Sequence, residues 1–146
     1  MNIALKYKWI PVENQPGVHY QFPEEISSHF RANWNGPAVY RWIVFQQEPG
    51  DLRQLYVGET ELLPRRIYGY LNPGPSQRTN QRLKAEFEKE LSNGHKVILE
   101  VLSFESLSIE GISISMGDLT DKMVRRVLES LFTMYYSKSG YIVLNA

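Results

Sequence analysis

The chain of 146 residues contains 42% hydrophobic and 22% charged residues, and its 16 basic residues balance its 16 acidic ones. This length fits a single domain with one core, the composition excludes a disordered chain, and zero net charge argues against a protein that coats nucleic acid without selection. Because no cysteine occurs, the sequence excludes a disulfide framework and a thiolate zinc site, so any metal must rest on oxygen or histidine ligands.

The start of the chain has the features of neither a signal peptide nor a membrane span. Lys6 and Lys8 interrupt the first apolar residues, and no small-residue cleavage site follows them. No run approaches the roughly 18 consecutive apolar residues that indicate a spanning helix. We therefore expect cytoplasmic residence and no membrane partner.

The first 35 residues carry few structural signals, because prolines and a glycine divide them into short apolar pieces. Pro23 followed by two glutamates is typical of a helix start, which predicts a short helix from there to about Ala32. We expect residues 1–35 to form an N-terminal extension packed on a domain of residues 36–146.

A β-hairpin and a helix are predicted next. Residues 38–46 (AVYRWIVFQ) and 52–58 (LRQLYVG) are rich in β-branched and aromatic residues and are joined by a short turn. Thr60 offers an N-cap for a helix that carries Ile67 and Tyr70, and residues 72–76 (NPGPS) end that helix.

The rest of the chain predicts two longer helices and two strands. A helix over residues 79–93 stops at Gly94, and residues 96–104 (KVILEVLSF) predict a strand. Residues 105–117 have no clear period and stay unassigned. A helix over residues 121–136, capped by Asp118 or Thr120, is expected to place on one face Val124, Leu128, Leu131 and Tyr135.

Residues 141–144 resume an extended run, which completes the element order β-β-α-α-β-α-β. This order predicts an α/β (α+β) fold in which a small, mostly antiparallel central sheet is flanked by helices.

Several reactive side chains follow one another at distinctive spacings. Tyr40 and Tyr56 lie in the two hairpin strands, where tyrosines more commonly serve packing alone. Arg66 comes eight residues after Gly58, and Tyr70 lies four residues further on, so both can point from one helix face at the hairpin. Glu129 lies on the last predicted helix, and Asn145 follows it by sixteen residues.

This set resembles the GIY-YIG nuclease family over roughly residues 36–145. The family's two tyrosine motifs appear here as Ala38-Val39-Tyr40 and Tyr56-Val57-Gly58, so the first motif departs from Gly-Ile-Tyr, and Glu59 stands where some members have a lysine. The resemblance implies a metal-dependent endonuclease that hydrolyses the phosphodiester bonds of nucleic acid, with a GIY-YIG-like fold in residues 36–146. The catalytic residues that it implies are Tyr40, Tyr56, Arg66, Tyr70, Glu129 and Asn145.

The resemblance also implies a role for each of these residues. One of the two hairpin tyrosines would orient or deprotonate the attacking water, and Arg66 would grip the scissile phosphate through its planar fork. Glu129 would hold one Mg²⁺ or Mn²⁺. Tyr70 would bond the phosphate or the leaving oxygen, and Asn145 would position Glu129 or the local backbone.

The partner that the resemblance implies is nucleic acid, with DNA preferred to RNA. We expect contacts with it from Arg65 and from the polar, basic segment 77–82, through Arg78, Asn80 and Arg82. A homodimer is an option, because one site cuts one strand.

Other interpretations remain open at the level of sequence. A GIY-YIG-like module that binds nucleic acid or protein without cutting is the main alternative. Glu129 could instead form a surface ion pair with Arg125, four residues before it on the same helix. A small-molecule enzyme lacks support, because no cofactor signature occurs.

Overall fold

The computed structural model describes residues 3–48 and 50–145. Met1 and Asn2 of the predicted extension, Pro49 of the predicted turn and Ala146 at the end lie outside the described residues. The central sheet has the strand order β1-β6-β4-β5-β8, with β7 beside β6. Its strands are β1 (Ile3–Pro11), β4 (Ala38–Phe45), β5 (Leu52–Thr60), β6 (Lys96–Ile109), β7 (Ile112–Ile114) and β8 (Ile142–Val143).

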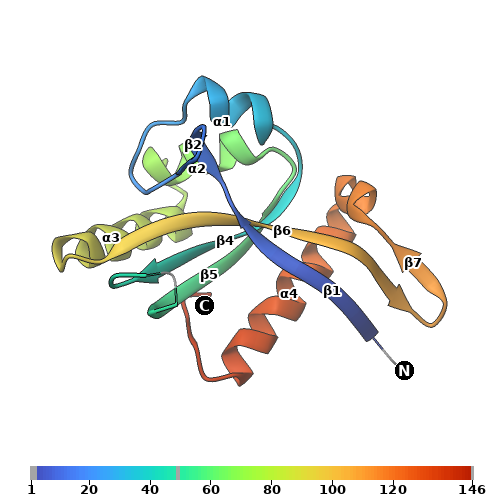
Figure 1. Ribbon diagram of the computed structural model, residues 1–146. Coiled ribbons are helices and arrows are strands. Elements are labelled where there is room, and N and C mark those ends of the chain that lie inside the picture. The colour runs from blue at the N-terminus through green and yellow to red at the C-terminus, as the bar shows by residue number, and fades with distance from the viewer. Residues whose placement is uncertain (1–2, 49, 146) are drawn as a thin grey trace.

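The strand pairs of this sheet are antiparallel except for β5 and β8, which run parallel. A small separate sheet is formed by β2 (Glu13–Gln15) and β3 (Val18–His19). The helices are α1 (Ser28–Asn33), α2 (Leu63–Leu71), α3 (Arg78–Ser92) and α4 (Lys122–Lys138), with a 3₁₀ helix, η1 (Met116–Thr120), before α4. The predicted α/β (α+β) architecture, a mostly antiparallel sheet flanked by helices, is confirmed (Figure 1).

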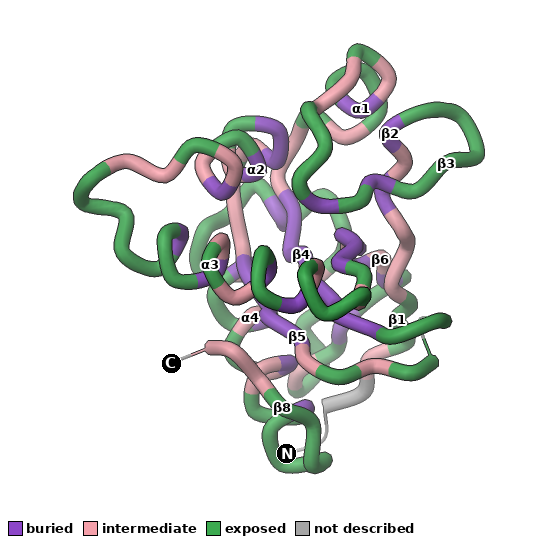
Figure 2. The backbone as a smooth tube through the Cα atoms, turned by 90° about the vertical axis from the view of Figure 1, so that its left-hand side faces the viewer, coloured by how far each residue is buried: buried purple, intermediate pink, exposed green. Residues whose placement is uncertain are grey.

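The two faces of the sheet support separate hydrophobic clusters. Successive side chains of a strand point to opposite faces, so β4 sends Trp42 toward α2 and α3 and Ile43 toward α4. Because both faces are covered, β4 is buried along nearly its whole length, and Figure 2 shows buried residues concentrated in the central strands. This double burial explains why its sequence is apolar or aromatic at every position except Arg41.

The N-terminal segment adds the edge strand β1 to the sheet. β1 pairs with β6 from Ile3 opposite Ile109 to Pro11 opposite Glu100. The second half of β6 pairs with β1 on one side and with β7 on the other, so the strand runs five residues past its predicted end at 104. The segment 105–117, which has no period, is thus the end of a long strand, a short return strand and the start of η1.

Two predicted helix starts are wrong, and so is the predicted cap of the last helix, because Asp121 caps α4 instead of Asp118 or Thr120. The first helix begins at Ser28, where the side chain of Ser27 accepts a hydrogen bond from the backbone of Phe30. Glu24 does not begin this helix, because its carboxylate closes a turn by accepting from the backbone N–H of Gln21. Thr60 belongs to β5, and its hydroxyl accepts from the backbone of Leu62, which occupies the N-cap position of α2.

The predicted inner face of the last helix is confirmed at Leu128 and Val124, which contact the core, and is wrong at Tyr135. The residues of α4 that are buried against the sheet are Arg125, Leu128, Phe132 and Tyr136, whereas Tyr135 is 50% exposed. Apolar residues occur on several sides of α4, so its sequence does not define a single apolar stripe. No helix in residues 3–48 and 50–145 is both long and apolar enough to cross a membrane.

Candidate active site

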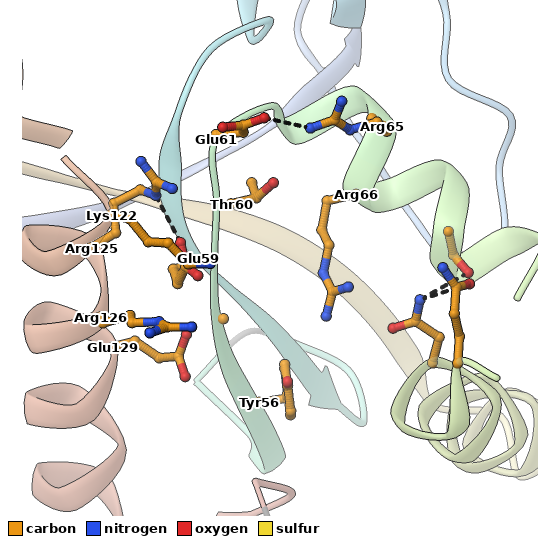
Figure 3. Close-up of a pocket in the computed structure, with 14 residues that line it drawn as sticks. Tyr56, Glu59, Thr60, Glu61, Arg65, Arg66, Lys122, Arg125, Arg126 and Glu129 are labelled. Atoms are coloured by element: carbon orange, nitrogen blue, oxygen red, sulfur yellow. Dashed lines mark hydrogen bonds and ion pairs between the residues drawn. The ribbon is translucent and has the colours of Figure 1, made fainter. Parts of the chain in front are cut away.

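A pocket of about 700 Å³ opens where β5 reaches the edge of the sheet, between α2 on one side and α4 on the other (Figure 3). The parallel strand β8 pairs only with Gln54 and Leu55, so the later residues of β5 are free of a neighbouring strand on that side. The pocket is lined by Tyr56, Gly58, Glu59, Thr60, Glu61, Arg65, Arg66, Gly69, Gln77, Asn80, Lys122, Arg125, Arg126 and Glu129. Five of these residues are basic and three are acidic.

Three of the predicted residues form one hydrogen-bonded cluster beside this pocket. The hydroxyl oxygens of Tyr40 and Tyr70 are 2.6 Å apart. Arg66 donates from Nε to Tyr40 over 3.0 Å and from Nη2 to Tyr70 over 3.3 Å. Its Cζ also lies 4.9 Å from the centre of the Tyr70 ring. The guanidinium group of Arg66 on α2 thus links this helix to strand β4 through Tyr40.

Burial determines the ionisation of the two clustered tyrosines. It raises the pKa of Tyr40 to about 12, although the positive charge of Arg66 opposes the shift. It also raises the pKa of Tyr70 well above the usual value. Both phenols therefore stay neutral near pH 7. In this state they hold Arg66 in place as hydrogen-bond acceptors instead of acting as bases.

A glycine makes room for Tyr40. Gly58 lies opposite Tyr40 in the hairpin. A Cβ atom at position 58 would lie 2.4 Å from both Cζ and the hydroxyl oxygen of Tyr40. Only glycine therefore lets this ring lie across β5 and reach Arg66.

Tyr56 is the predicted tyrosine that reaches the pocket. It belongs to β5, is 9% exposed and lines the pocket. Tyr40 and Tyr70 are fully buried and are absent from the lining. Figure 3 shows Tyr56 and Arg66 extending from β5 and α2 into the space that Glu129 faces from α4. Of the two hairpin tyrosines, only Tyr56 therefore faces the pocket, together with Arg66.

Glu129 presents a half-buried carboxylate on the α4 side of the pocket. Burial raises its pKa, the negative charge of Glu59 adds to the shift, and Arg66 and Arg126 oppose it. Among the described residues its carboxylate has no hydrogen-bond or ion-pair partner, although its backbone oxygen accepts from Thr133. Arg66 and Arg126 thus compensate this negative charge from a distance, without a hydrogen bond or ion pair among the described residues.

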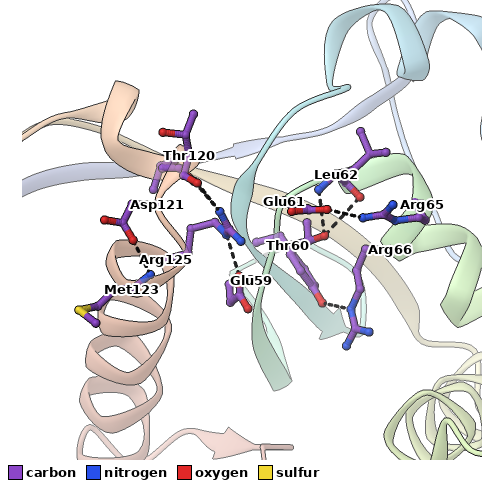
Figure 4. A network of polar contacts seen from close by, with 12 residues as sticks. Glu59, Thr60, Glu61, Leu62, Arg65, Arg66, Thr120, Asp121, Met123 and Arg125 are labelled. Carbon is purple, nitrogen blue, oxygen red and sulfur yellow. Dashed lines mark hydrogen bonds and ion pairs between the residues drawn. The ribbon is translucent and has the colours of Figure 1, made fainter.

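The surface ion pair between Glu129 and Arg125 does not form. Arg125 is 4% exposed, and its Nε donates to Glu59 over 2.7 Å (Figure 4). Its Nη1 donates to the backbone oxygens of Leu119 at 2.9 Å and Thr120 at 3.2 Å. Arg125 therefore fastens η1 and the start of α4 to β5 and leaves Glu129 free.

Asn145 lies at the edge of β5. Its Nδ2 donates to the backbone oxygen of Val57 over 2.7 Å, and its Oδ1 accepts from the backbone N–H of Val57 over 3.0 Å. Beyond the residues of β5 that pair with β8, the side chain of Asn145 thus forms the backbone hydrogen bonds that a neighbouring strand would form. Of the two roles predicted for Asn145, the structure places it at the backbone, next to Tyr56 and Gly58.

The predicted nucleic-acid contacts divide into two groups. Arg65 and Asn80 line the pocket, whereas Arg78 and Arg82 are exposed on α3 outside the lining. Arg65 forms an exposed ion pair with Glu61 at 2.9 Å. Asn80 is 2% exposed, and its Nδ2 lies 3.3 Å from both the backbone oxygen of Gly69 and Oε1 of Gln77. Asn80 therefore fastens α3 to α2.

The sequence interpretation missed three basic residues of the pocket, which lie at the start of α4. Lys122, Arg125 and Arg126 occupy positions i, i+3 and i+4 of the helix that carries Glu129. This spacing places them on the same side of the helix, and it was a signal that the sequence already contained.

Glu129 is the carboxylate of this pocket that would contribute to a site for a hard divalent cation. Within the described part of the chain, no three histidine, aspartate or glutamate side chains gather into a group that could hold a metal ion. Mg²⁺ commonly binds through one or two carboxylates and takes its remaining ligands from water and substrate phosphates. A free carboxylate in a wide polar pocket meets that requirement.

No family model, no curated protein and no solved structure matches the chain.

Proposed function

We propose that this protein is a metal-dependent endonuclease of the GIY-YIG type, which hydrolyses phosphodiester bonds of nucleic acid, with DNA preferred to RNA. One observation carries the proposal. A guanidinium held by two buried tyrosines shares a pocket with Tyr56 and with the unpaired carboxylate of Glu129. These groups would supply the charge neutralisation on the phosphate and the positioned water that phosphodiester hydrolysis needs.

Arg66 would bind the scissile phosphate. Tyr40 and Tyr70 accept hydrogen bonds from its Nε and Nη2, and among the described residues Nη1 has no hydrogen-bond partner. Nη1 and the second hydrogen of Nη2 are therefore available for a two-point contact with phosphate oxygens. In this proposal Tyr40 and Tyr70 are positioning residues, because both lie behind Arg66 and outside the pocket lining.

Tyr56 would orient the attacking water. Its ring is anchored in β5, opposite Trp42 in the hairpin, and the residue lines the pocket. The water oxygen would attack phosphorus as the bond between phosphorus and the 3′ oxygen breaks. The attacking water would lose a proton to solvent, and the departing 3′ oxygen would take one from solvent. Asn145 would support this arrangement indirectly, because it fixes the backbone of the neighbouring Val57.

Glu129 would hold the metal. A bound Mg²⁺ or Mn²⁺ would neutralise charge on the phosphate oxygens and on the departing oxygen. A carboxylate that has no hydrogen-bond or ion-pair partner among the described residues supports a cation at this position. Arg125 supports the site by pairing with Glu59, so the positive charge of Arg125 is not directed at Glu129.

Incubation of the purified protein with supercoiled plasmid, single-stranded DNA and structured RNA tests the proposal. We expect cutting with Mg²⁺ or Mn²⁺ and none in EDTA, with DNA cut in preference to RNA. Binding without cutting under all conditions would overturn the proposal in favour of a module that binds nucleic acid. Absence of both binding and cutting would overturn the assignment to nucleic acid altogether.

A further inference from the structure

Two of the five positive charges in the pocket are neutralised by partners within the protein. Arg65 pairs with Glu61 at 2.9 Å, and both side chains are well exposed. Arg125 pairs with Glu59 at 2.7 Å and is buried. Neither residue offers a fully available charge to a bound anion.

The other three positive charges have no ion-pair partner in residues 3–48 and 50–145. Arg66 is on α2, and the remaining two, Lys122 and Arg126, are on α4. The two α4 residues are four positions apart, and like charges at this spacing repel one another unless an anion lies between them. Figure 3 shows Arg126 extending beside Glu129, on the side of the pocket opposite Arg66.

The start of α4 is held firmly in place. The side chain of Asp121 accepts from the backbone N–H of Met123 over 2.8 Å and caps the helix. Arg125, between Lys122 and Arg126, fastens the same turn to Glu59 and to the backbone of η1. The two unpaired cations therefore project from a fixed platform, which reduces the entropy lost when they bind an anion.

We infer that Lys122 and Arg126 form a second phosphate site, which takes the backbone phosphate next to the scissile one. This inference rests on the proposed function, because it assigns the scissile phosphate to Arg66. The strand would run across the pocket from α2 to α4 and pass Glu129. The substrate class is therefore a nucleic-acid strand with charged phosphates at two successive linkages.

Salt dependence of binding provides the first test. A short fluorescent duplex DNA is titrated with the full chain in EDTA, so that nothing is cut, for wild type, Lys122→Gln, Arg126→Gln and the double variant. Lys138→Gln is the matched control, because it removes the same charge from the exposed last turn of α4, outside the pocket. All these side chains are exposed, so the variants should keep the wild-type melting temperature.

Loss of one phosphate contact lowers the slope of log affinity against log salt by about 0.9 for duplex DNA. We expect a decrease of that size in the double variant and no change in Lys138→Gln. Equal decreases in each single variant and in the control would overturn the inference, because they would indicate general electrostatic attraction. Normal cutting with an unchanged slope in the double variant would overturn only the inference, whereas absence of binding and cutting in wild type would overturn the proposed function.

A neutral phosphate analogue provides the second test. In a DNA substrate that the protein cleaves, methylphosphonate replaces one phosphate at a time. The KM of each modified substrate is compared with that of the unmodified one. Neutralising the linkage next to the cut should raise the wild-type KM at least about tenfold, the effect of one charge-assisted hydrogen bond. In the double variant, neutralising that linkage should leave KM unchanged, because the contact is already absent. An equal loss in wild type and double variant at every linkage would overturn the site.

Discussion

The hydroxyl oxygens of Tyr40 and Tyr70 lie 2.6 Å apart, and Arg66 donates a hydrogen bond to each. The first tyrosine comes from β4 and the second from α2, so the contact joins the hairpin to the helix that follows it. Because both rings are buried, Arg66 has little freedom to move. A guanidinium fixed in this way can bind phosphate without further ordering.

Arg66 and its neighbour Arg65 should differ sharply in function. Arg66→Lys should lower kcat about 10²-fold or more, because a lysine cannot bond both tyrosines and still present a planar fork to phosphate. Arg65→Lys is the control and should be nearly silent, since Arg65 is exposed and paired with Glu61. Single-turnover rates at saturating substrate measure both. Equal defects would show that Arg66 contributes only general attraction.

The hydroxyl of Tyr56 should be needed for cutting more than for folding. Tyr56→Phe should slow the chemical step about 10²-fold, as expected when a group that positions the reacting water is lost, with little change in melting temperature. Tyr68→Phe removes a hydroxyl from an exposed ring on α2 outside this pocket and should leave the rate unchanged. A wild-type rate for Tyr56→Phe would remove this tyrosine from the mechanism.

Gly58 should tolerate no side chain. In Gly58→Ala the new Cβ would overlap the Tyr40 ring, so the ring must move away from Arg66. We expect a loss of about 1–3 kcal/mol in the free energy of unfolding, typical of overpacking, together with reduced kcat. Gly36→Ala is the control, since nothing lies within 4 Å of its added Cβ. Denaturant melts and cleavage rates report the two effects, and a fully stable, active Gly58→Ala would contradict the geometry.

The parts of the site that local spacing defines could be predicted from the sequence. Arg66 and Tyr70 share a helix face because they are four residues apart, and the hairpin strands are rich in β-branched and aromatic residues. The edge strand β1 carries a local strand signal, because apolar and charged residues alternate from Leu5 to Trp9. Its place in the sheet could not be predicted from local spacing, because its partners in β6 lie 89 to 106 residues away.

The α4 side of the pocket was harder to predict for a different reason. Arg125 has the composition of a surface residue, yet it is buried because Glu59 and two backbone oxygens satisfy it. A pattern of apolar residues cannot reveal a buried guanidinium whose partners come from a strand sixty-six residues earlier. The buried face of α4 therefore includes Arg125, which the predicted face did not.

The carboxylate of Glu129 should lower stability at neutral pH. Its raised pKa means that the folded protein holds this proton to higher pH than the unfolded chain, so stability falls as pH rises through the raised pKa. Without metal, Glu129→Gln should therefore melt higher than wild type near pH 7. The two proteins should melt alike in acid, below the usual pKa of a glutamate. A lower melting temperature for Glu129→Gln at pH 7 would indicate a structural role for the charge.

Cutting by Glu129→Gln, measured over a range of Mg²⁺ and Mn²⁺ concentrations, tests the central claim most directly. The control is Glu88→Gln, which removes an exposed carboxylate of α3 outside the pocket. We predict that Glu129→Gln folds, binds DNA in EDTA and shows no cutting at metal concentrations that saturate wild type and the control. Metal-dependent cutting at the wild-type rate by Glu129→Gln would contradict the account.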